Sequence, residues 1–372
     1  APPAPVQRVA LVASEFEVRE AEVAGVTLNL MLHPSHVGNL APLADAGPLL
    51  VERIGEKLEE AERIGLPYPY EGLTMVEVPN ILRGYGGGWR RDTTLAQPGL
   101  VLVRESGLPT ARWDVRFVEG VDAGDREGGE PAAIADGLKR FFAGDIGGGN
   151  PQACASRSFF DFSVGWEGRE AAAIDFGAET LTSWLLTEER IYFSARLFEG
   201  EDAQETIQAL LPDFFRSGAN NLNEALLRQQ LSRPAVWNAV EAAPLGELRT
   251  DEDPQQALDA LVLKGGALVR SLSEAFDRER LGTLLGTVRE RYGGQRISRA
   301  QLERTAEELD IPLRRWFELW LDSLEAPAFA VESARVQRMG DAEDGTPRYQ
   351  HVVRLRNDGK VAGIVVLESA FH

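Results

Sequence analysis

The spacing of apolar residues changes twice along this 372-residue chain, and this change restricts its possible folds more than any other feature. Up to residue 128, apolar and polar residues mostly alternate, as in strands of a half-buried sheet. From Ala132 onward they recur at helical spacing, and after Pro327 they alternate again. These periods predict an α+β protein with a strand-rich half (1–128), a helical half (129–327) and a short β module (328–372).

Single elements can be placed within this outline. A helix is expected from Pro48 to Ile64, because proline suits the first turn and Gly65 ends the pattern. Ser298 and Gln301 form a capping box that opens another helix, and Pro312 precedes a further one. Strands are expected at 23–32, 73–78, 100–103 and 113–118, helical stripes at 134–142, 207–215 and 281–288, and a hairpin at 352–356 and 361–367 with its turn at 357–359.

The charge of the chain excludes nucleic acid as a partner. The chain carries 58 acidic and 39 basic residues, a net charge of −19, so a nucleic-acid backbone would be repelled.

Cysteine content and the ends of the chain give further limits. Cys154 is the only cysteine, so the chain has no internal disulfide. No run of 18 apolar residues is present to span a membrane. Position 1 is alanine, so we expect the native chain to begin upstream, and the strand-like end at His372 favours a chain that continues.

Residues 156–184 (SRSFFDFSVGWEGREAAAIDFGAETLTSW) contain the most informative pattern. Three phenylalanines lie within four positions, a polar turn follows at 167–169, and a second apolar run contains one acid, Glu179. This pattern predicts two helices joined by a polar loop.

The same stretch resembles the zinc site of gluzincin peptidases. In those enzymes two histidines at i and i+4 and a glutamate on the next helix bind zinc, and a glutamate beside the first histidine is the general base. Glu179 opens a segment similar to the family's E-G-L-A-x-Y and lies 19 residues after Phe160. The resemblance therefore puts Ser156 and Phe160 at the histidine positions and Arg157 at the base position. A gluzincin frame without its zinc ligands is what this match implies.

Three further patches follow the order of membrane-alanyl-aminopeptidase-type enzymes. Residues 261–267 (LVLKGGA) resemble the Y-x-K-G-a segment, with Val262 in place of the tyrosine that stabilises the oxyanion. Residues 315–321 resemble the closing tryptophan helix, and 66–79 resemble the strand entry "GPYP…lvevP". Around the glycine-rich residues 84–89 the family's Gly-x-Met-Glu-Asn anchor is missing. The resemblance spans residues 25–330 and implies a thermolysin-like fold with a mixed sheet half and a helical half.

This resemblance implies a non-catalytic scaffold or interaction domain with no cofactor and no metal. Its expected partner is a protein or an extended peptide in the cleft between the halves. Similar degenerate domains are found fused to ABC-type transport permeases. We therefore expect an extracytoplasmic domain of a larger membrane transport protein, next to membrane-embedded segments of the same longer chain. Arg157 and Glu179 are expected to contact each other, because a buried acid without its metal needs a cationic partner.

Two other functions stay open. One is an active metallo-aminopeptidase or another hydrolase with a non-standard site, for which Asp175 and Glu179 share a helix face at i, i+4. The four histidines include no i, i+4 pair, and His33 and His36 in HPSH favour an ordinary corner after a strand. The other is a small-molecule binding module, for which the sequence has no specific determinant.

Overall fold

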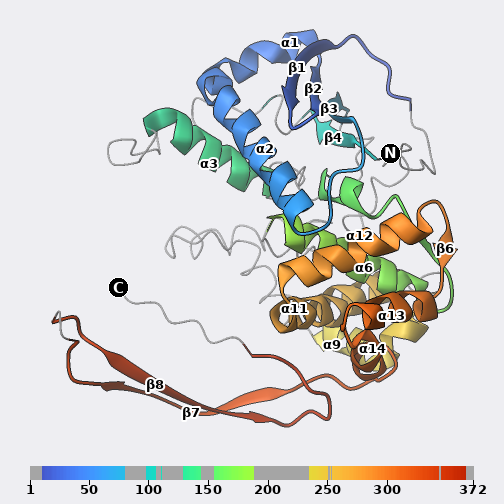
Figure 1. Ribbon diagram of the computed structural model, residues 1–372, viewed down its shortest axis with the longest axis vertical. Coiled ribbons are helices and arrows are strands. Elements are labelled where there is room, and N and C mark those ends of the chain that lie inside the picture. The colour runs from blue at the N-terminus through green and yellow to red at the C-terminus, as the bar shows by residue number, and fades with distance from the viewer. Residues whose placement is uncertain are drawn as a thin grey trace.

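A sheet half, a helical half and a projecting two-stranded ribbon make up the computed structural model (Figure 1). The residues described are 11–79, 98–105, 110, 129–143, 155–187, 234–249, 252, 254–342 and 345–365. The mixture of helices and a mixed sheet confirms the α+β class. The strand predicted at 113–118, the helix predicted at 207–215 and the glycine-rich stretches 84–89 and 144–150 lie outside the described residues.

Within the described residues, the sheet half contains a four-stranded mixed sheet with the strand order β1-β2-β3-β4. Its strands are β1 (Glu17–Val23), β2 (Val26–Leu32), β3 (Gly72–Val78) and β4 (Leu100–Arg104). β1 is antiparallel to β2, whereas β2, β3 and β4 are parallel. The strand predicted at 23–32 is confirmed over 26–32 as β2, but it begins later than predicted, because Ala24 and Gly25 both have positive φ and form a tight turn between β1 and β2.

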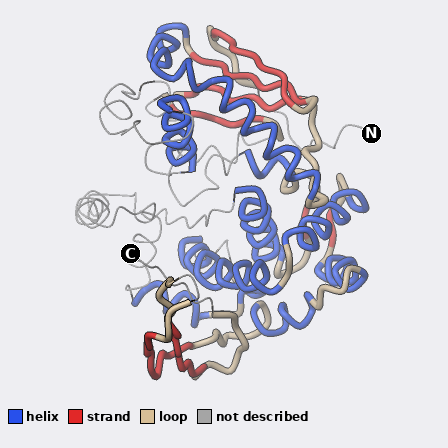
Figure 2. The backbone as a smooth tube through the Cα atoms, turned by 60° about the vertical axis from the view of Figure 1, so that its left-hand side comes forward, coloured by secondary structure: helices blue, strands red, loops and turns tan. Residues whose placement is uncertain are grey.

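Helices cover one face of this sheet, as Figure 2 shows. The parallel strands β2 and β3 require a crossover, which runs through α1 (Pro34–Val37), η1 (Gly38–Ala46) and α2 (Gly47–Arg63). The helix predicted at 48–64 is thus confirmed as α2. A second helix, α3 (Gly129–Ala143), packs Ile134 and Leu138 against Val101 and Val103 of β4. The first helix after residue 128 therefore contributes to the core of the sheet half.

The helical half is built around one large apolar core, whose largest fully buried side chains include Phe160, Leu185 and Trp320. The predicted stripe at 281–288 lies in α12 and buries Leu281, Leu284, Leu285 and Val288, each stabilising the fold by roughly 1.5–3 kcal/mol. The capping box is also confirmed, since Gln301 accepts a 2.9 Å hydrogen bond from the Ser298 amide. The elements are η5 (Arg157–Phe159), β5 (Gly165–Trp166), α6 (Ala171–Thr187), α9 (Pro234–Ala242), η7 (Leu245–Glu247), α10 (Pro254–Ala260), η8 (Leu261–Gly265), α11 (Gly266–Ala275), α12 (Arg278–Tyr292), β6 (Arg296–Ile297), α13 (Arg299–Glu308) and α14 (Leu313–Trp320).

The two halves meet where the end of α2 lies on α12. Gly65 ends α2 with a φ of +82°, and the Leu66 amide bonds back to the Ala61 carbonyl at 2.8 Å, as in a Schellman motif. A Cβ on Gly282 would lie 2.2 Å from the Ile64 carbonyl oxygen, and one on Gly286 would lie 2.1 Å from that of Gly65. Glycine on α12 is therefore what lets the two backbones come this close.

The ribbon consists of β7 (Phe329–Arg338) and β8 (Tyr349–Asn357), which pair antiparallel. The predicted hairpin with its turn at 357–359 was wrong. β8 pairs with the upstream strand β7, and residues 361–365 form no strand. The Asn357 side chain instead accepts from the amides of Ala328 and Gly359, both at 3.0 Å, and so closes the root of the ribbon. Among the described residues no helix is both long and apolar enough to cross a membrane.

Replacing Gly282 with alanine should lower the free energy of unfolding by roughly 2–4 kcal/mol, since the new methyl group meets backbone and forces α2 and α12 apart. Gly177→Ala in α6 is the matched control. Its Cβ would lie 3.8 Å from Val269, an ordinary contact, so we expect no loss and a gain of up to about 1 kcal/mol from helix propensity. Urea unfolding of both variants checks this, and equal stabilities would contradict the described contact.

Candidate functional site

The stretch predicted to be two helices contains only one full helix. Residues 157–159 form the 3-10 element η5, residues 160–163 form a turn, and only α6 is a long helix. In the structure the Phe159 ring packs edge-on against Tyr68 with 5.0 Å between the ring centres, and the ring centres of Phe160 and Trp166 are 6.3 Å apart. Burial of both rings thus accompanies the break after η5.

Arg157 and Glu179 do contact each other, as predicted from the stretch. Nε of Arg157 lies 3.2 Å from Oε1 of Glu179 and 3.6 Å from Oδ2 of Asp161. The three side chains are only 12%, 11% and 5% exposed. The guanidinium carbon also lies 5.1 Å from the centre of the Phe162 ring, on the same short turn. One buried cation is therefore held between two buried carboxylates and an aromatic face.

The other predicted positions lie in the core of the helical half. Ser156, Phe160 and Val262 are 3%, 0% and 4% exposed. Val262 belongs to the π-helical turn η8, which packs against α6, as η5 also does. The structure thus brings the elements of all five predicted positions together. Phe160 and Val262 are apolar core residues, and Arg157 carries the charge opposite Glu179.

A buried lysine in η8 was not predicted as a site residue. Lys264 is 3% exposed, and its Nζ donates to the Ser323 carbonyl. Burial lowers the pKa of Lys264 to about 8, and the nearby Glu325 carboxylate opposes this shift. The signal in the sequence was a single lysine within the apolar run LVLKGGALV. Through this bond the π-helical turn is attached to the segment that leads into the ribbon.

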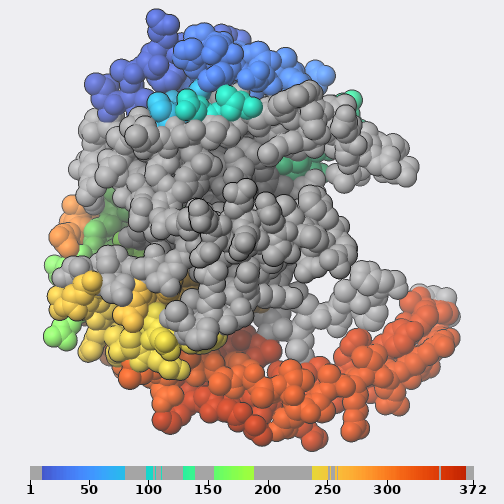
Figure 3. Space-filling model, turned by 180° about the vertical axis from the view of Figure 1, so that it is seen from behind, coloured from blue at the N-terminus to red at the C-terminus, as the bar shows by residue number. Residues whose placement is uncertain are grey.

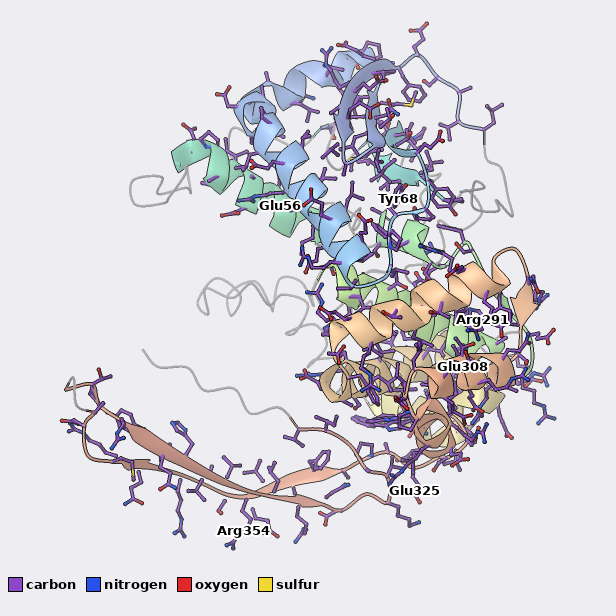
Figure 4. The ribbon with its side chains drawn as sticks, viewed as in Figure 1. Glu56, Tyr68, Arg291, Glu308, Glu325 and Arg354 are labelled. Atoms are coloured by element: carbon purple, nitrogen blue, oxygen red, sulfur yellow. The ribbon has the colours of Figure 1, made fainter. Side chains whose placement is uncertain are left out.

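An aromatic cluster joins the site stretch to the sheet half. Tyr68, labelled in Figure 4, donates to the Gly72 carbonyl at 2.9 Å, and its ring lies 5.8 Å from that of Tyr70. Burial raises the pKa of Tyr68, and so does the neighbouring Tyr70. Arg289 of α12 donates to the Phe159 carbonyl, and burial lowers its pKa. Tyrosine hydroxyls held neutral in this way act as fixed hydrogen-bond donors.

The two histidines of HPSH lie at a corner after a strand, as predicted, but an acid faces them. The buried Glu77 of β3 accepts from the His33 amide at 2.9 Å, and its other oxygen lies 2.6 Å from Nδ1 of His36. An acid in the apolar strand GLTMVEV was the signal that could have revealed this pair. Within the described ranges, no group of three or more His, Cys, Asp or Glu residues is arranged to hold a metal ion.

The described surface has a pocket at the start of α12 beside the end of α13, lined by Asp277, Glu279, Arg280, Thr283 and Leu309. None of the five predicted site positions lines it. No model of a known protein family matches the sequence, and no curated protein is similar to it. Its function is therefore inferred from its own residues.

Arg157→Met should lower the free energy of unfolding by about 3–5 kcal/mol, because it leaves Glu179 and Asp161 buried without their cation. Adding Glu179→Gln should recover part of this loss. Arg169→Met is the control, since Arg169 is 83% exposed and its pair with Glu247 at 3.9 Å contributes at most about 1 kcal/mol. A loss below 1 kcal/mol for Arg157→Met would show that this arginine does not hold the two acids.

Lys264 should make the free energy of unfolding depend on pH in the range where its folded and unfolded forms bind different numbers of protons. Its pKa is about 8 in the folded chain and 10.5 as the ordinary value, so the unfolded state binds more protons between these pH values. The free energy of unfolding of the wild type, relative to Lys264→Met, should therefore rise as the pH increases from 8 to 10.5. Chemical unfolding of both proteins across this window measures the difference, and a flat difference would contradict the lowered pKa.

Proposed function

We propose that this chain is a non-catalytic, aminopeptidase-like scaffold domain with a thermolysin-like arrangement of its two halves. The observation that carries the proposal is the ion pair of Arg157 with Glu179. In the gluzincin frame these are the positions of the general base and of the third zinc ligand. In this proposal a side chain of this chain takes the place of the metal as partner of the acid, and a 3-10 turn stands where the family has its zinc-binding helix.

Electrostatics supports this reading of the site. Two like unit charges 4 Å apart repel by about 4 kcal/mol at an effective dielectric constant of 20, and a divalent ion roughly doubles this. An ion bound by Glu179 would lie close to a guanidinium that is always protonated. Arginine is also a poor general base for the same reason. Ser156 and Phe160, at the two histidine positions, are buried and offer no imidazole.

The proposed role of such a domain is to hold a protein or peptide rather than to cleave one. Among the described strands, β1 and β4 lie at the edges of the sheet, and an extended peptide laid along an edge strand is the binding mode we propose. The resemblance further supports an extracytoplasmic location, as part of a larger membrane transport protein. Fractionation of cells of the source organism, followed by detection of this chain, tests the location.

An active metallo-aminopeptidase or another hydrolase is the alternative function. It would have to use acids such as Asp175 and Glu179, and Glu179 is engaged by Arg157. The scaffold reading is the one supported by a specific contact, that of Arg157 with Glu179.

The purified chain should bind no stoichiometric zinc and should release no amino acids from a panel of aminoacyl substrates. The physical reason is the cation already paired with Glu179. Elemental analysis and turnover assays, with a zinc aminopeptidase as positive control, measure both. One tightly held zinc per chain that is lost in Glu179→Gln, or metal-dependent turnover lost in the same variant, would refute the proposal.

A further inference from the structure

The β7–β8 ribbon has two chemically different faces. Residues directly opposite each other in an antiparallel pair point to the same side. The register, with its bulge between Val331 and Ser333, therefore assigns each side chain to a face. The apolar face carries Phe329, Val331, Ala334 and Val336 with Tyr349, His351, Val353 and Leu355, and it is bounded by Arg338 at one end and Asn357 at the other. The arginine face carries Arg335, Arg354 and Arg356.

The apolar face is open to solvent. Val331 and Val336 are 65% and 63% exposed, and Phe329 and Tyr349 are 41% and 45% exposed. In Figure 3 the ribbon forms an arm at the lower edge of the molecule. Large side chains gathered on one face of a projecting arm mark an interaction surface.

The arginine face is positively charged. Arg356 is paired with Glu332 and Asp358, but Arg335 and Arg354 make no ion pair with the described residues. Arg354 points away from the helical half in Figure 4. β7 and β8 together carry four arginines and one acid, whereas the whole chain has 58 acidic and 39 basic residues. The ribbon is thus a cationic element on an acidic protein.

Each strand of the ribbon is hydrogen-bonded on one side only within the described part of the chain. A two-stranded ribbon is marginally stable in water, and its free edges can accept a third strand. An added strand would place alternate side chains on the two faces of the ribbon. Its residues on one side would meet valines and Leu355, and those on the other side would meet Arg335 or Arg354.

The charges decide which strand fits. A second copy of the ribbon added edge to edge would bring arginines beside arginines, and like charges on neighbouring strands are destabilising. An anionic membrane would be repelled by a chain with a net charge of −19. We propose that the ribbon binds an extended segment of a partner protein in which apolar residues alternate with acidic ones. This names a partner class for the scaffold role and rests on the proposed function only for that role.

The test uses the full chain and a synthetic peptide that alternates valine with glutamate over about nine residues, the length of such a strand. We expect saturable binding by calorimetry or fluorescence anisotropy that weakens with added salt. Arg335→Glu/Arg354→Glu should weaken the affinity at least about tenfold, and Val331→Thr/Val336→Thr should also weaken it.

The matched controls change exposed residues outside the ribbon. They are Arg315→Glu on α14 of the helical half and Val18→Thr on β1, and both should bind as the wild type does. All substituted side chains are exposed on their surfaces, and thermal unfolding checks that the variants are folded.

Several results would overturn the proposal. They are no binding by the folded wild type, equal binding of a valine–lysine peptide, or unchanged affinity in the arginine variant. A dimer in sedimentation that Val331→Thr/Val336→Thr dissociates would assign the apolar face to a second copy. Arginine-dependent binding to vesicles of phosphatidylcholine and phosphatidylserine would assign it to a membrane. Zinc content and peptidase turnover do not involve the ribbon, so this proposal and the proposed function can fail separately.

Discussion

The close approach of two backbones at the end of α2 is the contact on which the rest of the structure depends. The carbonyl groups of Ile64 and Gly65 lie on the glycine face of α12, and Arg278 of α12 pairs with Glu60 of α2 at 2.7 Å. Tyr68 and Phe159 then pack on each other across the same junction. The position of the sheet relative to η5 and α6 follows from this contact, because little side-chain rearrangement is possible where backbone meets backbone.

Elements with strong local signals could be predicted from the sequence. The helix ended by Gly65, the capping box at Ser298 and the stripe of α12 all depend on neighbours a few residues apart. The predictions that failed concern strands and turns whose structure depends on pairing with another segment of the chain. Asn357-Asp358-Gly359 has the composition of a hairpin turn, yet β8 pairs with β7, so Asn357 caps the root of the ribbon instead. Ala24 takes a positive φ that no local rule assigns to alanine, because pairing of β1 with β2 requires it.

The candidate site was predictable in its charges but not in its shape. A buried acid and an arginine one element away were expected to meet, and they do so at 3.2 Å. The 3-10 turn was not foreseen. Its neighbouring rings Phe159 and Phe160 pack on Tyr68 and Trp166, which lie in other parts of the chain. Glu77 and Lys264 each interrupt an apolar run, but their partners come from other elements, His36 in one case and Ser323 in the other.

The root of the ribbon has a mechanical consequence. Just before β7, Asp322 accepts two hydrogen bonds from Arg299 of α13, at 2.5 and 2.9 Å, and Ser323 accepts one from Lys264 of η8. Lys360, just after β8, reaches back to Glu325 at 2.6 Å. These bonds fix the root of the ribbon to the helical half, so a force applied to the ribbon would act on that root. Tension applied along the ribbon is carried by charged hydrogen bonds into α13 and into the π-helical turn that packs against α6, the helix of Glu179.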